Sequence, residues 1–398
     1  MKAFFTSVVI TLTLIDVPAQ WTELSSGVLV ELGGVHVLDE DSYLVGGEGG
    51  ILLRTDDGGD TWSTDVIIGG GDLGTILRLD ANTLLMAADD GMVARSTDNG
   101  DNWTLIQTPA PNVIYDITSI GDLVWASGRD GGLVHSTDKG LTWTAQNSGT
   151  QERLHGIHAL NANDLVAVGR EGVLLRSDNG GATWQLSIEA GGEDLRGVLF
   201  LDDVQQTGLI AGLEGELLRS TDQGTNWMTI TLPTLLGPEA MASEDPDLVY
   251  AVGENALILR STDQGQTWEE MTTTAFSELS AIDVKDGVAV AVGANGTIIK
   301  YDPGASTSVG EAIRSQALNV FPNPSAGRVN IEWIDERSVP AGASLEIRLI
   351  DGRLVDRRVW PAGKQRAIIE LDAGNYVVSL IGPEGTMFQR NLLVTGAR

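Results

Sequence analysis

The sequence predicts an all-β protein in which a seven-bladed β-propeller is followed by a small β-sandwich domain. A phrase that ends in tryptophan recurs six times, and its tryptophans are 41, 40, 41, 43 and 41 residues apart. Short aliphatic and β-branched runs alternate with glycine-rich turns, and no helical periodicity is sustained through the repeats. A period of about 40 residues that holds four short strands is typical of propeller blades.

The recurring phrase has serine or threonine first, aspartate third, glycine fifth and tryptophan last. The third position is occupied by Asp57, Asp98, Asp138, Asn179, Asp222 and Asp263, and the last by Trp62, Trp103, Trp143, Trp184, Trp227 and Trp268. Hydroxyl and carboxylate oxygens can accept backbone N–H bonds across a tight turn, and glycine can adopt a positive φ. Tryptophan can pack between blades. The phrase therefore predicts a structural turn between the third and fourth strands of each blade, rather than a calcium or catalytic site.

The repeat also predicts how the ring closes. A seventh unit at residues 290–299 has lost the phrase, which is reduced there to Tyr301-Asp302-Pro303. At the other end of the chain, Trp21–Leu24 looks like the strand that follows a phrase, although no phrase precedes it. We expect this N-terminal strand to complete the seventh blade, because closure removes open sheet edges. The propeller is predicted over residues 20–302.

The phrase resembles the Asp-box, or bacterial neuraminidase repeat, and the resemblance covers residues 20–302. Six-bladed sialidases, two-propeller xyloglucanases and sortilin-type propellers also carry Asp-boxes. The Gly-x-x-Gly-x-Ile/Leu lead-in to the third strand and the seven units are most similar to the photosystem II assembly-factor propellers and their bacterial relatives. That resemblance implies a non-catalytic platform for binding another protein, and it transfers no particular binding residue to this chain.

Function is expected where the blades differ, because features common to every blade build the scaffold. Two variable positions, at the entry to the innermost strand and in the turn between the second and third strands, belong to the face opposite the phrase turns. The predicted ligand site on this face consists of Tyr115, Arg129, Arg153, His155, Arg170 and Arg196. Its favoured ligand is an acidic peptide, a carboxylate or an anionic glycan. The alternative interpretation is that these are solvated turn residues with no common role.

Composition argues against several other functions. The chain has 25 lysines and arginines against 55 acidic residues, and its net charge of −30 repels nucleic-acid backbones. It has no cysteine and only four histidines, so no cofactor and no metal site are predicted. A glycoside hydrolase is the alternative function, since Tyr115, Glu239 and the arginines supply the residue types of a sialidase. The sialidase Arg-Ile-Pro motif is absent, however, and the order of these residues along the chain differs.

The ends of the sequence differ from the repeats. Residues 1–19 have the basic start, short apolar run and small residues of a secretory signal peptide. No other segment reaches about 18 apolar residues, so no membrane span is predicted. Residues 303–316 have the composition of a linker. From Glu311 onward there are 11 basic and 10 acidic residues, and alternating strands and glycine turns predict a separate β-sandwich at residues 317–398.

Three phrases of this last domain, Asn319–Gly327, Ile350–Val355 and Gly374–Leu380, closely resemble those of the type A sorting domain of the type IX secretion system. The resemblance implies that the secretion machinery recognises the domain and carries the protein across the outer membrane. It also implies cleavage near the linker, followed by attachment to surface lipopolysaccharide or release. The protein is therefore expected at the outer cell surface or outside the cell. The alternative is an ordinary carbohydrate-binding sandwich.

Overall fold

The computed structural model describes residues 21–301, apart from 68, 70, 189–191, 202–205 and 274, and seven strands between residues 318 and 394. The chain divides into two compact units, one of residues 20–303 and one that contains the later strands. The predicted signal peptide and the predicted linker lie outside the described residues.

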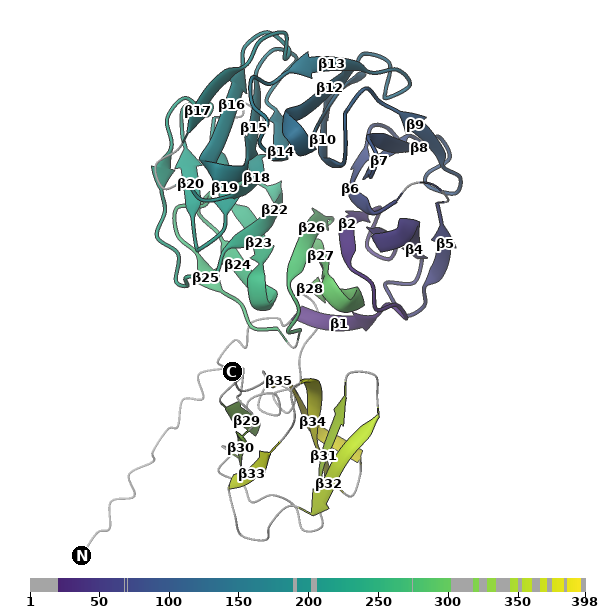
Figure 1. The fold of residues 1–398 in the computed structure, drawn as a ribbon, viewed down its shortest axis with the longest axis vertical. Coiled ribbons are helices and arrows are strands. Elements are labelled where there is room, and N and C mark those ends of the chain that lie inside the picture. Colours follow the sequence, from purple (N-terminus) through teal and green to yellow (C-terminus); the bar gives the residue numbers. More distant parts are fainter. Residues whose placement is uncertain are drawn as a thin grey trace, which may run out of the picture. The chain divides into compact units, whose positions relative to one another are not determined.

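The first unit is a seven-bladed β-propeller, as predicted, with seven four-stranded antiparallel sheets around a central channel (Figure 1). The first three blades hold β2 (Leu32–Val37), β3 (Tyr43–Gly47), β4 (Ile51–Thr55) and β5 (Ser63–Val66); β6 (Leu73–Arg78), β7 (Leu84–Ala88), β8 (Met92–Ser96) and β9 (Thr104–Gln107); β10 (Ile114–Ile120), β11 (Leu123–Gly128), β12 (Gly132–Ser136) and β13 (Thr144–Asn147). Within each of these blades the strands pair in chain order from the channel outward.

The next three blades repeat the arrangement. They hold β14 (Leu154–Ala159), β15 (Leu165–Gly169), β16 (Val173–Ser177) and β17 (Gln185–Ile188); β18 (Leu195–Phe200), β19 (Gly208–Gly212), β20 (Leu217–Ser220) and β21 (Met228–Thr229); β22 (Pro238–Asp245), β23 (Leu248–Gly253), β24 (Leu257–Ser261) and β25 (Glu269–Glu270). In five blades a single 3-10 turn joins the second and third strands: η1 (Glu48–Gly50), η2 (Arg129–Gly131), η3 (Arg170–Gly172), η4 (Glu254–Ala256) and η5 (Ala294–Gly296). No helix in the described residues is long and apolar enough to cross a membrane.

The seventh blade closes the ring in the predicted way. It consists of β26 (Leu279–Lys285), β27 (Val288–Gly293), β28 (Thr297–Tyr301) and, on its outer edge, the N-terminal strand β1 (Trp21–Ser25). The two ends of the propeller are thus joined by an antiparallel ladder between β1 and β28, which covers an edge that would otherwise be open.

The hydrophobic core is divided into layers between neighbouring blades. In each layer the tryptophan of a phrase packs against residues of the preceding blade, so that Trp143 of the third blade contacts the cluster that includes Leu85 of the second. Trp21 occupies the corresponding place in the closing blade. It is 1% exposed and meets the ring of Tyr250 of the sixth blade edge-on, with centroids 5.8 Å apart.

The phrase turns share one hydrogen-bond pattern, which the third blade illustrates. The Ser136 hydroxyl donates to Asp138 Oδ1 at 2.8 Å and accepts the N–H of Gly140 at 2.9 Å, while Gly140 has a φ of +77°. Asp138 also accepts the hydroxyl of Thr142 at 2.7 Å and its backbone N–H at 2.8 Å. These bonds favour the ionised carboxylate and lower the pKa of Asp138 to about 2. In the fourth blade, Asn179 makes the corresponding backbone bond with its amide oxygen.

The described strands of the second unit form two antiparallel sheets. One has the order β29 (Leu318–Phe321), β30 (Arg328–Trp333), β33 (Arg366–Glu370), and the other β32 (Leu354–Val359), β31 (Ser344–Leu349), β34 (Gly374–Gly382), β35 (Gly385–Val394). An all-β second domain is therefore present, and the packing of its sheets into a sandwich stays a prediction.

Candidate functional site: the channel mouth

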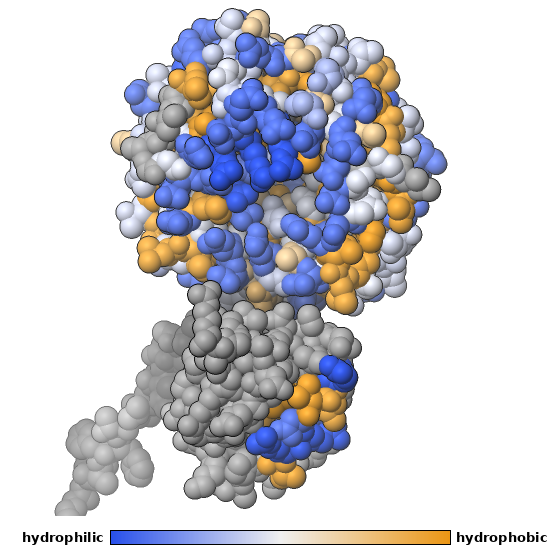
Figure 2. All heavy atoms as spheres, in the orientation of Figure 1, coloured by the Kyte–Doolittle hydropathy of each residue, from blue (hydrophilic) through white to orange (hydrophobic). Residues whose placement is uncertain are grey.

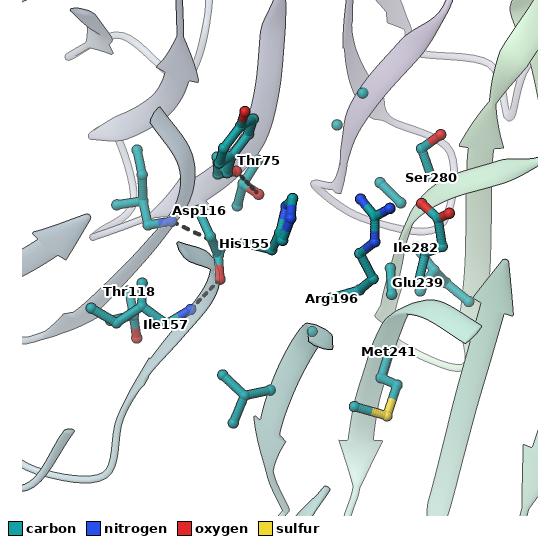
Figure 3. A pocket seen from close by; sticks show the side chains of 18 of the residues that line it. Thr75, Asp116, Thr118, His155, Ile157, Arg196, Glu239, Met241, Ser280 and Ile282 are labelled. Atoms are coloured by element: carbon teal, nitrogen blue, oxygen red, sulfur yellow. Dashed lines mark hydrogen bonds between the residues drawn. The ribbon is translucent and has the colours of Figure 1, made fainter. Parts of the chain in front are cut away.

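The innermost strands of all seven blades line a cavity in the central channel (Figure 3). Its volume is about 410 Å³, which is within the range of pockets that take small molecules or a short piece of a peptide. The wall combines backbone and apolar groups with a few polar side chains, and these polar side chains are concentrated in four consecutive blades.

A β-bulge near the start of each innermost strand aims one residue at the channel. In the third blade, Ile114 pairs with Gly128 and Asp116 pairs with Ser127, so that Tyr115 between them is left out of the ladder. The register shifts near the start of the innermost strand in all seven blades, across one residue in six of them and across Gly74 and Thr75 in the second. An unpaired bulge residue can be redirected away from the sheet face that its neighbours follow. The fold therefore supplies a ring of equivalent positions at the mouth of the channel.

The residues at these bulge positions divide the ring into two parts. In chain order the positions hold Gly33, Gly74, Tyr115, His155, Arg196, Glu239 and Ser280. The first blade contributes no side chain, the second and seventh contribute only the small hydroxyls of Thr75 and Ser280, and the third to sixth contribute large polar or aromatic groups. The four large side chains lie on one side of the channel, and the opposite side, which we call the open side, has only small residues at these positions.

Arg196 points into the cavity between His155 and Glu239 (Figure 3). Its Nε atom is buried and has no hydrogen-bond partner, and its guanidinium forms no ion pair with any described residue. A buried guanidinium nitrogen without a partner is unfavourable by about 1–3 kcal/mol. The position therefore favours an anionic group from outside the protein.

An aromatic pair forms the wall beside Arg196. The rings of Tyr115 and His155 are 5.2 Å apart at an angle of 33°. Burial, and next the positive charge of Arg196, lower the pKa of His155 to about 4, so the imidazole is neutral at pH 7. The pair therefore offers an uncharged, flat surface next to a permanent positive charge.

Glu239 lies on the other side of Arg196. Burial is the main reason why its pKa is raised to about 7, and the negative charge of Glu278 is the next. Arg196 acts in the opposite direction without offsetting these effects. At neutral pH this site therefore holds a carboxyl group that can carry a proton.

The remaining predicted arginines surround the cavity without lining it. Arg153 precedes β14 and Arg170 opens η3, and both are close enough to His155 to lower its pKa. Arg170 makes a long ion pair of 4.0 Å with Asp194, whereas Arg153 has none among the described residues. Arg129 opens η2 and acts on Asp89 of the second blade instead.

The basic side chains on this face are confined to three blades, which also carry acidic ones such as Asp130, Glu171 and Asp194. Of the 13 lysines and arginines in residues 20–302, only Arg129, Arg153, Arg170 and Arg196 are on the mouth face, and all four belong to the third, fourth and fifth blades. The mouth-face segments of the other four blades carry only acidic charges: Glu31, Glu48, Asp72, Asp89, Asp90, Glu239, Glu254 and Glu278. A strongly hydrophilic patch covers the region of β10, β14 and β18 (Figure 2).

Sequence reasoning placed Tyr115, His155 and Arg196 in the predicted site, and the structure brings them together around one cavity. It left Glu239 out of that site, although Glu239 occupies the equivalent position in the sixth blade, and this equivalence was the available signal. It also missed Glu278, which precedes β26 and is not at a bulge position.

Asp116 lines the same cavity and has a structural role. Its carboxylate accepts the backbone N–H of Ile117 and, in the neighbouring blade, that of Ile157, both at 2.9 Å. Burial raises the pKa of Asp116 to about 6 in spite of these bonds. Asp283 joins the seventh blade to Val37 of the first by a corresponding bond of 2.8 Å. These carboxylates tie adjacent blades together at the channel wall.

No group of three or more histidine and carboxylate side chains in the described residues could hold a metal ion. The site instead offers a guanidinium, a neutral aromatic wall and a carboxyl group that can carry a proton. This set can bind an anionic group by charge-assisted hydrogen bonds and pack against an attached apolar portion.

The fold and this site define a seven-bladed propeller with a polar, asymmetric channel mouth. A family model described as "Photosynthesis system II assembly factor YCF48" matches residues 148–307, and one described as "DUF6242 beta propeller domain" matches residues 82–195. No curated protein matches the chain. The chain is thus a β-propeller protein that resembles the YCF48 assembly factor over part of its length.

Solved structures agree with this class. One described as "YCF48 bound to D1 peptide" has a TM-score of 0.59 and 19% identity, and the match covers 72% of this chain and 96% of that one. YCF48 from Cyanidioschyzon merolae has a TM-score of 0.58 and 18% identity, and the match covers 72% of this chain and 100% of that one. The WD40 β-propeller domain of Doa1 has a TM-score of 0.60 and 13% identity, and the match covers 72% of this chain and 98% of that one. At these identities the likeness shows the fold.

Proposed function

We propose that the protein is a non-catalytic binding platform whose channel mouth takes an acidic segment of a partner protein. The observation that carries the proposal is the bulge ring, in which one scaffold position presents Tyr115, His155 and Arg196 in three successive blades. The unpartnered Arg196 and the surrounding arginines favour carboxylates, and the aromatic pair favours an attached peptide chain. The similar structure of YCF48 with a D1 peptide supports a peptide ligand.

Binding of labelled octapeptides to the purified protein, measured by fluorescence anisotropy, tests the proposal. We expect an octapeptide rich in aspartate and glutamate to bind, and its asparagine–glutamine and lysine counterparts to bind at least tenfold more weakly. Arg196→Ala should weaken binding of the acidic peptide about tenfold or more, because a charge-assisted bond is worth about 1.5–3 kcal/mol. Arg260→Ala is the matched control, since Arg260 pairs with Glu269 in the outer part of the sixth blade. Equal binding of all three peptides would contradict the proposal.

The alternative of a glycoside hydrolase is tested with the same preparation. Tyr115 and Glu239 both line the cavity, so an enzyme working there should lose activity in Tyr115→Phe and Glu239→Gln. We expect no turnover of sialosides or other glycans by the wild-type protein. Turnover that both substitutions abolish would replace the binding proposal by a catalytic one.

We also propose that the C-terminal unit directs export by the type IX secretion machinery to the outer cell surface or the medium. The support is the sequence resemblance of residues 317–398 to a type A sorting domain and the signal-peptide pattern of residues 1–19. The unit is separate from the propeller in its contacts. In a host that carries this machinery, deletion of residues 317–398 should leave the protein in the periplasm. Delivery of the truncated chain to the surface would refute the proposal.

A further inference from the structure

The cavity places one glutamate beside the single guanidinium that enters it, and a second glutamate acts on the first. Glu239 belongs to the bulge ring beside Arg196, and Glu278 lies just before β26 in the next blade. The negative charge of Glu278 acts on Glu239 and, after burial, is the next cause that raises its pKa. Because two close carboxylates resist simultaneous ionisation, a proton on one of them relieves their repulsion.

This arrangement changes what Arg196 can bind. With Glu239 ionised, the guanidinium is already balanced by a neighbouring negative charge, and a ligand carboxylate would be a second negative charge beside it. With Glu239 protonated, the positive charge of Arg196 is uncompensated within the cavity, and the Glu239 O–H is an additional donor. Close carboxylates resist simultaneous ionisation, so the protonated state is the one that admits an anion.

We propose that the cavity binds one carboxylate of an acidic peptide against Arg196, and that this binding requires a proton on Glu239. The inference rests on the proposed peptide-binding function. It specifies the ligand group, a carboxylate, and the side chain that must carry the proton, Glu239. The charged groups that act on Glu239 are Glu278, Arg196 and Glu254. No covalent bond changes, and the proton is taken up from solvent when the peptide binds.

The neighbouring titratable groups allow the proton to be assigned. His155 has a pKa of about 4 and therefore stays neutral above pH 6. The carboxylates of the peptide, with an ordinary pKa of about 4, stay ionised there. Glu239, with a pKa of about 7, changes from mostly protonated at pH 6 to mostly ionised at pH 8. The competent fraction falls about tenfold over this interval, and so should the affinity.

The experiment measures binding of the acidic octapeptide to the full chain at pH 6, 7 and 8 by fluorescence anisotropy. We expect the dissociation constant of the wild type to be about tenfold lower at pH 6 than at pH 8. Glu239→Gln, which keeps the shape and a hydrogen-bond donor, should bind at all three pH values with nearly the pH 6 affinity. Glu278→Gln should move the midpoint of the pH dependence to lower pH, whereas Glu48→Gln, an exposed acid on the same face, should leave it unchanged.

Calorimetry of the wild type in two buffers of different ionisation enthalpy adds an independent readout, with uptake of about half a proton expected at pH 7. Thermal unfolding of each variant checks that it is folded. Wild-type binding that is equal at pH 6 and pH 8, or Glu239→Gln binding that keeps the wild-type pH dependence, would overturn the inference while peptide binding stands. Absence of acidic-peptide binding at every pH would overturn the inference together with the proposed function.

Discussion

At the scale of single residues, the site depends on which side chain occupies one repeated backbone position. Glycine at this position contributes no side chain in the first two blades, whereas tyrosine, histidine, arginine and glutamate occupy it in the next four. The same backbone therefore gives a neutral ring at His155 and a permanent charge at Arg196. A repeat protein can build an asymmetric site in this way without changing the scaffold.

His155 should make the protein sensitive to mild acid. Its pKa is about 4 in the folded protein and about 6.5 in an unfolded chain, so its contribution to stability is fully present above pH 6.5 and is lost as the pH falls toward 4. We expect His155→Gln to reduce the loss of unfolding free energy between pH 7 and pH 4.5 by about 1–3 kcal/mol. Urea unfolding at the two pH values measures this loss. An equal loss in the wild type and the variant would show that His155 titrates normally.

At the scale of elements, strand pairing and close backbone contacts fix where these side chains lie. A β-bulge turns one residue of each innermost strand toward the channel, and the strands of the first two blades approach closely there. A Cβ atom on Gly34 would lie 1.9 Å from the carbonyl oxygen of Gly74, so no larger residue fits without moving the backbone. This contact brings the inner strands together on the open side of the channel.

The sequence predicts the phrase turns and the strands more fully than it predicts the site. The phrase works through local hydrogen bonds such as that from Thr142 to Asp138, which are readable from spacing alone. The equivalence of Tyr115, His155 and Arg196 also follows from the period. The effect of Glu278 on Glu239 does not, because Glu278 precedes β26 in the next blade and is not at a bulge position.

The phrase turns predict a second dependence on pH. Asp138 has a folded pKa of about 2, below the ordinary value of 3.8, so its contribution to stability is present above about pH 4 and is lost as the pH falls toward 2. We expect Asp138→Asn to be tolerated, because Asn179 makes the same backbone bond in the fourth blade. Asp138→Ala should lower the free energy of unfolding at pH 7 by about 1–2 kcal/mol through lost hydrogen bonds. Chemical denaturation of the two variants measures their free energies of unfolding. Equal effects of Asp138→Asn and Asp138→Ala would contradict this account.

At the scale of the whole molecule, the propeller combines a closed ring with an uneven distribution of charge. The ladder between β1 and β28 joins the ends of the propeller, and the buried ring of Trp21 replaces the missing seventh phrase tryptophan. On the mouth face, basic side chains occur in three blades only, although the chain as a whole has a net charge of −30. The four mouth-face arginines of these blades are therefore isolated positive charges among acidic residues.

Closure should be the most vulnerable feature of the ring. Trp21→Ala removes a fully buried side chain from the layer between the sixth and seventh blades, and we expect it to lower the free energy of unfolding by about 3–5 kcal/mol. Loss of β1 from the edge of β28 would also expose an unpaired strand and promote self-association. Thr22→Ala is the control, since Thr22 lies in the same strand and is exposed. Guanidinium unfolding and size-exclusion chromatography measure both effects, and similar stability of the two variants would argue against this closure.

Hydrogen–deuterium exchange with and without the acidic octapeptide tests most directly whether the bulge ring is the binding site. The account predicts protection at the start of β10, β14, β18 and β22, around Tyr115, His155, Arg196 and Glu239, with unchanged exchange in the phrase turns on the opposite face. Protection confined to the phrase turns or to the outer strands would place the ligand elsewhere and contradict it.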